Sequence, residues 1–146
     1  MTRRTTAILG AALLLALAGC QGTPGGTSNG VGTDCGINQE QLYNAGGVII
    51  ATVTAACEPP PETHLLTMQL NLTARYRGET STETLASKQS SEIPSAAGLT
   101  LTIKHVCLPG TWTLILGTSG RSSDGAPFEW SDRKVLAGVT RDECTR

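Results

Sequence analysis

Residues 66–76 read LTMQLNLTARY, and this stretch decides the fold. Apolar side chains occupy every second position from Leu66 onward, while polar side chains such as Thr67 and Gln69 fill the positions between them. Strict alternation over this length is typical of a β-strand with one buried face and one face in water. The stretch therefore predicts a sheet that packs against a second layer.

The same period of two recurs along the chain and predicts further strands. The alternating runs cover residues 49–57, 99–107, 112–116 and 128–130. Residues 82–91 form a weaker candidate that is polar on both faces, which suits a sheet edge. Proline, glycine and aspartate clusters separate the runs and predict turns. Strands at this spacing predict an all-β fold, a small antiparallel sandwich of about six or seven strands.

The composition fits one small exported domain. The chain has 146 residues, of which 16 % are charged and 3 % aromatic, and its formal net charge of −1 falls to about −3 without the first 19 residues. Binding to nucleic acid needs a basic patch, and none is visible, so we expect no such partner. The only helix candidate covers residues 38–44, where Asn38 could cap a single turn.

The amino terminus predicts export and lipid anchoring. Arg3 and Arg4 precede an apolar run over residues 7–18, which is too short to span a bilayer and has the length of a signal-peptide core. The following Leu17-Ala18-Gly19-Cys20 resembles the lipobox of bacterial lipoproteins. This resemblance implies that diacylglycerol is attached to the Cys20 thiol and that the chain is cut before this residue. Two acyl chains give stable anchoring, so we expect the protein at the cell membrane, facing the extracytoplasmic side.

The chain then divides into three parts: a signal peptide over residues 1–19, the lipidated Cys20 with a tether to residue 34, and a β-domain over residues 35–146. The tether is rich in Gly, Ser and Thr, and we expect it to be disordered. At residues 26–30 it contains the G-x-S-x-G pattern of a nucleophile elbow. We attribute this match to the glycine-rich composition, because no predicted strand precedes it and no predicted helix follows it. The paired arginines leave two export routes open, the general one and the twin-arginine one.

Four cysteines remain in the domain, and an even number in an exported domain predicts disulfides. Cys57 and Cys107 each continue the apolar face of a predicted strand, so we expect them to pair across the core. Cys35 and Cys144 would then join the two ends of the domain by elimination. The pairing of Cys35 with Cys57 and of Cys107 with Cys144 is the alternative. Zinc is disfavoured because no two cysteines lie as close as a C-x-x-C motif.

Two segments carry a family resemblance. They are CEPPPETHL at residues 57–65 and CLPGTW at residues 107–112. They are similar to small secreted and lipid-anchored actinobacterial proteins, which have a Cys, a nearby His at the head of a strand and a later Cys-x-x-Gly-x-aromatic turn. The likeness covers about half of the mature chain. It implies an immunoglobulin-like sandwich without an assigned activity, favours the pairing of Cys57 with Cys107, and supplies no catalytic residue.

No motif in the sequence predicts an active site. His64 follows the proline turn, and we expect its ring to bond turn carbonyls; His105 is expected to be a partly buried residue at a strand end. Asp124, Glu129 and Asp132 could offer oxygens to calcium, but acids in solvated loops are the simpler interpretation. We therefore predict no catalytic residue, no metal site and no cofactor.

The function predicted from the sequence is a non-catalytic surface module that binds or shields an envelope protein or glycan. One specific version is a phage lipoprotein that excludes superinfection. The alternatives are a ligand or metal carrier and a small hydrolase that uses His64 or His105. A hydrolase would require a Ser or an acid within hydrogen-bond reach of one imidazole.

Overall fold

The computed structural model of the protein describes residues 34–146. The predicted signal peptide, Cys20 and almost all of the tether lie outside the described residues. Seven strands and one short helix follow in order along the chain: β1 (Asp34–Ala45), β2 (Val48–Glu58), β3 (Thr63–Tyr76), β4 (Glu79–Ser90), β5 (Leu99–Val106), β6 (Gly110–Arg121), β7 (Pro127–Val139) and α1 (Arg141–Cys144). No helix within this range has the length and apolar content needed to cross a bilayer.

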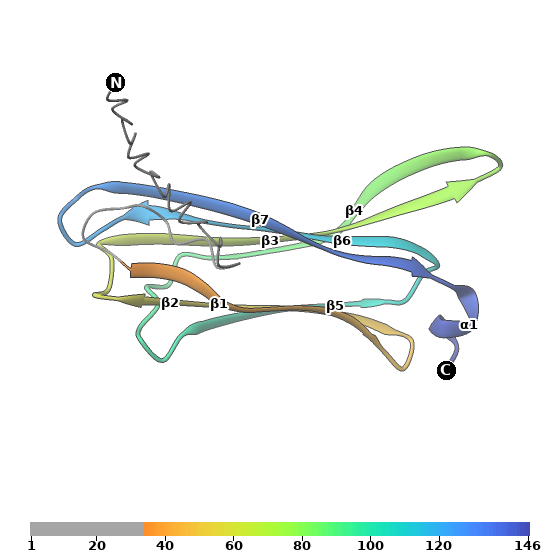
Figure 1. Ribbon diagram of the computed structural model, residues 1–146, viewed down its shortest axis with the longest axis horizontal. Helices are drawn as coiled ribbons and strands as arrows, with labels where there is room; N and C mark the ends of the chain where they lie inside the picture. Colours follow the sequence, from red (N-terminus) through yellow and green to blue (C-terminus); the bar gives the residue numbers. More distant parts are fainter. Residues whose placement is uncertain (1–33) are drawn as a thin grey trace, which may run out of the picture.

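The strands form two antiparallel sheets that pack face to face (Figure 1). One sheet has three strands in the order β1-β2-β5, and the other has four in the order β4-β3-β6-β7. This architecture confirms the predicted all-β, immunoglobulin-like sandwich of about seven strands. In Figure 1 the hairpin of β3 and β4 bends away from the rest of the sandwich at its tip.

The antiparallel order gives the sandwich two distinct ends. The Asp34 end holds the start of β1 and the β2–β3, β4–β5 and β6–β7 connections. The Cys144 end holds the β1–β2, β3–β4 and β5–β6 connections together with α1. The described chain therefore begins at one end of the sandwich and finishes at the other.

The core lies between the sheets and is built from alternate residues of the central strands. Trp112 on β6 is fully buried, and its indole N–H donates to the carbonyl of Leu108 at 2.9 Å. Around it pack aliphatic side chains from both sheets: Ile49, Val53, Leu66, Leu70, Leu114 and Leu116. The buried positions of β2, β3 and β6 recur every second residue, as the sequence predicts. Because the indole N–H has a hydrogen-bond partner, so large a group can be buried completely.

Bulges interrupt three of the four edge strands. Asn38 is an extra residue in β1, and Leu85 is one in β4. In β7 the register shifts beside Gly138, whose φ of 69° is the left-handed conformation that glycine tolerates. Bulges of this kind distort the row of free N–H and C=O groups at a sheet edge, so another strand pairs with it less readily.

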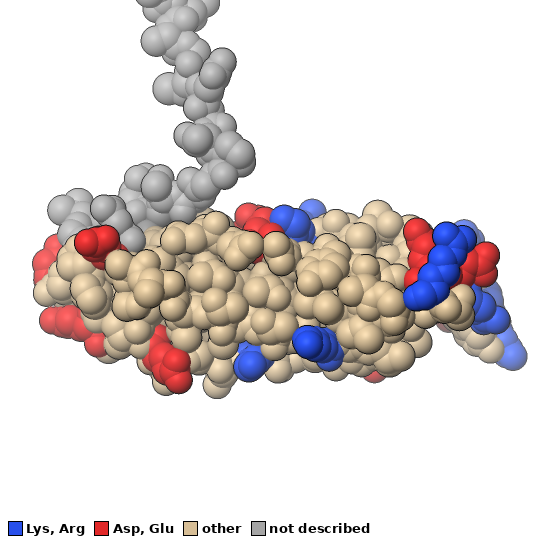
Figure 2. Space-filling model, turned by 90° about the horizontal axis from the view of Figure 1, so that it is seen from below, with Lys and Arg blue, Asp and Glu red and all other residues tan. Residues whose placement is uncertain are grey.

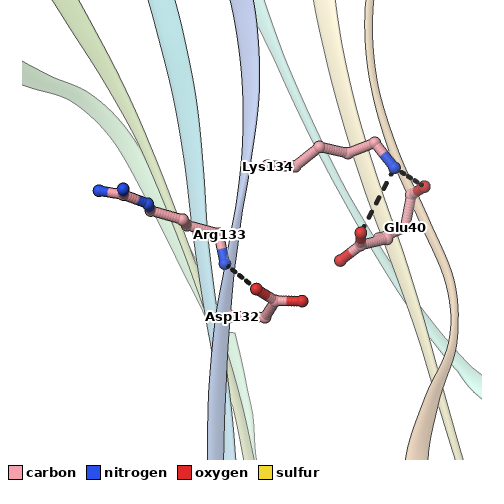
Figure 3. Close-up of polar contacts among 4 residues, drawn as sticks. All are labelled: Glu40, Asp132, Arg133 and Lys134. Atoms are coloured by element: carbon pink, nitrogen blue, oxygen red, sulfur yellow. Dashed lines mark hydrogen bonds and ion pairs between the residues drawn. The ribbon is translucent and has the colours of Figure 1, made fainter. Parts of the chain in front are cut away.

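Lysines close the two seams where the edges of the sheets approach each other. Lys134 reaches from β7 to β1, where its Nζ lies 3.2 Å from the Glu40 carbonyl oxygen and 3.3 Å from Glu40 Oε1 (Figure 3). On the opposite seam Lys88 of β4 donates to the carbonyl of Thr102 on β5 at 3.4 Å. Both lysines thus occupy main-chain acceptors that an edge strand would otherwise leave to water or to another chain.

Two predictions from the sequence, one about secondary structure and one about disulfide pairing, are wrong. Residues 38–44 do not form a helix turn but belong to β1, where Leu42 is buried against the core. The predicted disulfides are also wrong, since Cys35 pairs with Cys57 and Cys107 with Cys144. Cys35 and Cys57 are direct cross-strand partners in β1 and β2, with Cα atoms 4.1 Å apart. This was the alternative pairing of the sequence analysis.

The direction of the strands explains the error in the pairing. Cys57 and Cys107 are both buried, as their strand phase predicts. However, β2 and β5 run antiparallel, so β2 finishes at the Asp34 end and β5 at the Cys144 end. The N–H of Cys107 donates to the carbonyl of Gly47 at 2.8 Å, at the beginning of β2. At about 3.3 Å per residue, Cys57 lies about 30 Å from that point.

The disulfides make a direct test of the fold. Proteolysis without reduction should release one peptide pair joined through Cys35 and Cys57 and another joined through Cys107 and Cys144. The double variant Cys35→Ala/Cys57→Ala should lose about 3 kcal/mol in the free energy of unfolding, because a cross-link of this loop length restricts the unfolded chain by about that amount. Urea denaturation measures the loss. A peptide pair containing both Cys57 and Cys107 would contradict the observed topology.

Candidate functional site

His64 is the most completely buried ionisable residue that the sequence analysis singled out. It lies near the start of β3 and is only 4 % exposed. Its Nδ1 lies 3.2 Å from the Glu92 carbonyl oxygen, and its Nε2 lies 2.8 Å from the Thr118 hydroxyl. Because a carbonyl can only accept, Nδ1 carries a proton. The neutral ring is therefore the Nδ1-protonated form, in which Nε2 accepts from the Thr118 hydroxyl.

The surroundings of His64 favour a structural role. Burial lowers the pKa of the imidazole, and the hydrogen bond to the Glu92 carbonyl opposes this effect only in part. The ring packs beside Phe128 of β7, with the ring centroids 6.4 Å apart. Its bonds join the segment after β4 to β3 and β6. The predicted bond to a carbonyl is confirmed, although the carbonyl belongs to the β4–β5 connection and not to the proline turn.

His105 lies at the other end of the sandwich. Its Nδ1 is 2.9 Å from the carbonyl oxygen of the next residue, Val106, and its ring packs against Trp112 with the centroids 5.7 Å apart. The two histidines are therefore separated, His64 near the Asp34 end and His105 near the Cys144 end. Neither imidazole contacts a carboxylate in the hydrogen bonds of residues 34–146.

The structure does not gather the acids named in the sequence analysis. Asp124 lies in the β6–β7 connection, where its carboxylate accepts from the Ser122 hydroxyl and from the N–H of Ala126. The bond from Ser122 is the main reason why the pKa of Asp124 is lowered. Glu129 and Asp132 lie three positions apart on β7 and therefore point to different faces of the sheet. The part of the chain that the structure describes holds no cluster of three metal-binding side chains.

The outer face of the four-stranded sheet carries a regular array of uncharged polar side chains, which we name the outer grid. The residues on the two central strands β3 and β6 are Thr67, Gln69, Asn71, Thr73, Thr111 and Thr113. Their neighbours on the edge strand β4 are Thr82, Thr84, Ser87 and Gln89. Hydroxyl and amide groups therefore lie side by side across three strands.

Hydrogen bonds inside the outer grid hold several of its side chains in place. Gln69 Nε2 donates to the Thr84 hydroxyl at 2.6 Å, and the hydroxyls of Thr73 and Thr82 lie 2.8 Å apart. Asn71 Oδ1, by contrast, is buried and has no hydrogen-bond partner in the described structure. An acceptor left unpaired in this way costs free energy and marks a point where a donor would be favourable.

Two shallow depressions lie side by side on this face. One, of about 270 Å³, lies over β3 and β4 beside Gln69, Ser87 and Gln89. The other, of about 220 Å³, lies over β6 and β7 beside Gly117, Ser119 and Ser131. Thr67 and Ile115 border both depressions, which therefore adjoin each other.

Gly117 is the residue that keeps the second depression open. A Cβ atom at this position would lie 3.1 Å from Thr67 Oγ1 and 3.6 Å from the Trp130 carbonyl oxygen. Beside the gap, Ile115 is 39 % exposed in the middle of the sheet. Sequence reasoning missed this surface, because the members of one row come from distant parts of the chain and only the strand register brings them together.

The charged side chains are distributed differently. Figure 2 shows the molecule from the side of the three-stranded sheet, where one end carries red acidic groups alone, while blue basic groups lie in the middle and at the other end, there beside further acidic groups. The acids at the Asp34 end include Glu58, the last residue of β2, and Glu62, Glu92 and Asp124 in three connections. On the outer side of β7, the side chain of Arg133 points away from the seam that Lys134 closes (Figure 3).

No family model, no curated protein and no solved structure matches the chain.

The lowered pKa of His64 predicts a specific loss of stability in mild acid. The folded protein binds the ring proton less tightly than the unfolded chain does, so stability is complete above the ordinary pKa of 6.5 and is lost as the pH falls below it. The free energy of unfolding, measured by urea denaturation between pH 7.5 and pH 5.5, should fall. The pKa values of Asp124 and Glu143 are also lowered, but these two carboxylates affect stability in a separate pH range, near and below their ordinary pKa values of 3.8 and 4.5.

Variants of the two histidines separate this effect from a general one. His64→Gln should be less stable at neutral pH but should lose most of the slope between pH 7.5 and pH 5.5. His105→Gln should keep the slope of the natural protein. A flat profile in the natural protein, or an unchanged slope in His64→Gln, would show that the buried ring is not responsible.

Proposed function

We propose that this protein is a lipid-anchored, non-catalytic module that binds or shields a partner at the cell envelope. The observation that carries the proposal is the form of the domain: a twice cross-linked sandwich whose described part begins at one end, with the outer faces of both sheets available. Disulfides suit an oxidising compartment outside the cytoplasm. The lipobox-like segment ending at Cys20 supplies the anchor in this proposal.

The charge distribution bears on where the domain would lie relative to a membrane. A tether that leads to Cys20 would hold the Asp34 end toward the lipid. That end carries Glu58 at the end of β2 and Glu62, Glu92 and Asp124 on its connections, with one basic group, Arg121 of β6, among them. Anionic headgroups repel such a cluster of carboxylates. The domain would therefore stand away from the surface, and its faces would remain open to other envelope components.

The bonding of the histidines makes the hydrolase alternative less favourable. In a hydrolase the base accepts a hydrogen bond from a hydroxyl or water that a substrate can reach. In His64, Nδ1 donates to a carbonyl and Nε2 lies 2.8 Å from the Thr118 hydroxyl, but the two side chains belong to residues only 4 % and 3 % exposed, so the pair is closed off from a substrate. His105 bonds its neighbouring carbonyl and packs against Trp112. A module that acts by binding requires neither ring to react.

Substitution of the anchoring cysteine tests the proposal. Full-length protein expressed in its bacterial host should incorporate an alkyne-labelled palmitate and sediment with membranes until detergent is added. Cys20→Ser should lose the label and enter the soluble fraction. Cys35→Ala/Cys57→Ala is the matched control and should keep the label, because those two cysteines form a disulfide. Normal processing and membrane retention of Cys20→Ser would refute the lipid anchor.

A further inference from the structure

We propose that the outer grid binds a neutral glycan chain, which lies across the four-stranded sheet over Thr67 and Ile115. This inference rests on the proposed function and names the partner of that binding module. Two observations carry it: the uncharged hydroxyl and amide groups of the outer grid, and the two adjoining depressions.

The chemistry of the outer grid matches that of sugar hydroxyls. A hydroxyl or a carboxamide both donates and accepts hydrogen bonds, as a sugar hydroxyl does. Thr67, Gln69 and Gln89 border the first depression and provide such groups within a small area. An acidic or basic polymer would instead be recognised by a cluster of charges of one sign. Between Thr67 and Thr73 on β3, and between Thr111 and Ser119 on β6, this face carries no charged side chain, and the flanking Glu129 and Arg133 of β7 have opposite signs.

The internal hydrogen bonds of the face reduce the cost of binding. Gln69 is already fixed by its bond to Thr84, and the Thr67 hydroxyl donates to the Gly117 carbonyl at 3.3 Å. Side chains that are ordered before binding lose less conformational entropy when a ligand arrives.

The shape of the site favours a chain over a single sugar ring. The depressions reach from β4 across β3 and β6 to β7. Four neighbouring strands span about 14 Å at their usual spacing. Ile115 stands between the two depressions and offers an apolar patch on which the C–H groups of a sugar ring can rest. Gly117 leaves the space beside it that a following ring would occupy.

The sheet edges argue against an extended peptide as the occupant. A peptide that adds a strand needs a regular free edge. In the four-stranded sheet, β4 has a bulge at Leu85 and β7 has a register shift beside Gly138. The face of the sheet, and not its edges, is therefore the surface on which a linear partner can lie.

Calorimetry with defined oligosaccharides tests the inference. The full-length protein, held in zwitterionic micelles without sugar head groups, is titrated with cellohexaose, maltohexaose, mannohexaose and N-acetylchitohexaose, each up to about 5 mM. At least one should bind saturably. Gly117→Leu, which fills the second depression, should lower the affinity at least about tenfold. Gln69→Ala/Gln89→Ala, which removes donors without crowding the sheet, should do the same.

The controls distinguish this site from other surfaces. Thr52→Val/Thr102→Val removes a pair of hydroxyls 3.3 Å apart on the other sheet and should leave the affinity unchanged. The inference is overturned if none of the four hexasaccharides binds, if both grid variants bind as the natural protein does, or if the control variant loses as much affinity. In each of these cases a palmitate label on Cys20 would still support the anchored module, so the two proposals fail separately.

Discussion

The alternation of buried and exposed residues along antiparallel strands is the constraint on which this structure depends. Leu66, Met68 and Leu70 point into the core from β3, while the residues between them face water. The two sheets can pack only when every central strand keeps this phase. With few aromatic residues, the chain concentrates its packing around Trp112 and secures the ends with disulfides. The position of every polar group on the outer faces follows from the same register.

The sequence was sufficient for the parts of the fold that depend on local periodicity. The alternation in residues 66–76 predicted β3, and the polar run over residues 82–91 predicted the edge strand β4. β1 was missed because the extra residue Asn38 breaks its alternation, and because its outer positions are polar. Predicting the disulfide pairing required the direction of the strands as well as the phase of their buried residues. Both Cys57 and Cys107 are buried, but at opposite ends of the sandwich.

The candidate site was less accessible to sequence reasoning than the fold. His64 could be assigned a structural role because it follows a turn and begins a strand. However, its partners Glu92 and Thr118 are 28 and 54 residues away along the chain. The outer grid is harder still, since a row such as Gln89, Thr67 and Gly117 exists only when β4, β3 and β6 are in register. Threonine in a single strand signals only β-propensity.

The bulges and lysine bonds at the sheet edges affect how densely copies of the protein can lie on one surface. Molecules confined to a plane meet far more often than molecules in free solution, and an open strand edge would then seed chains of paired sheets. The bulges at Asn38 and Leu85, together with the bonds of Lys88 and Lys134, interrupt each route to such growth. The sandwich can therefore be packed densely as separate units, as the proposed lipid anchor would require.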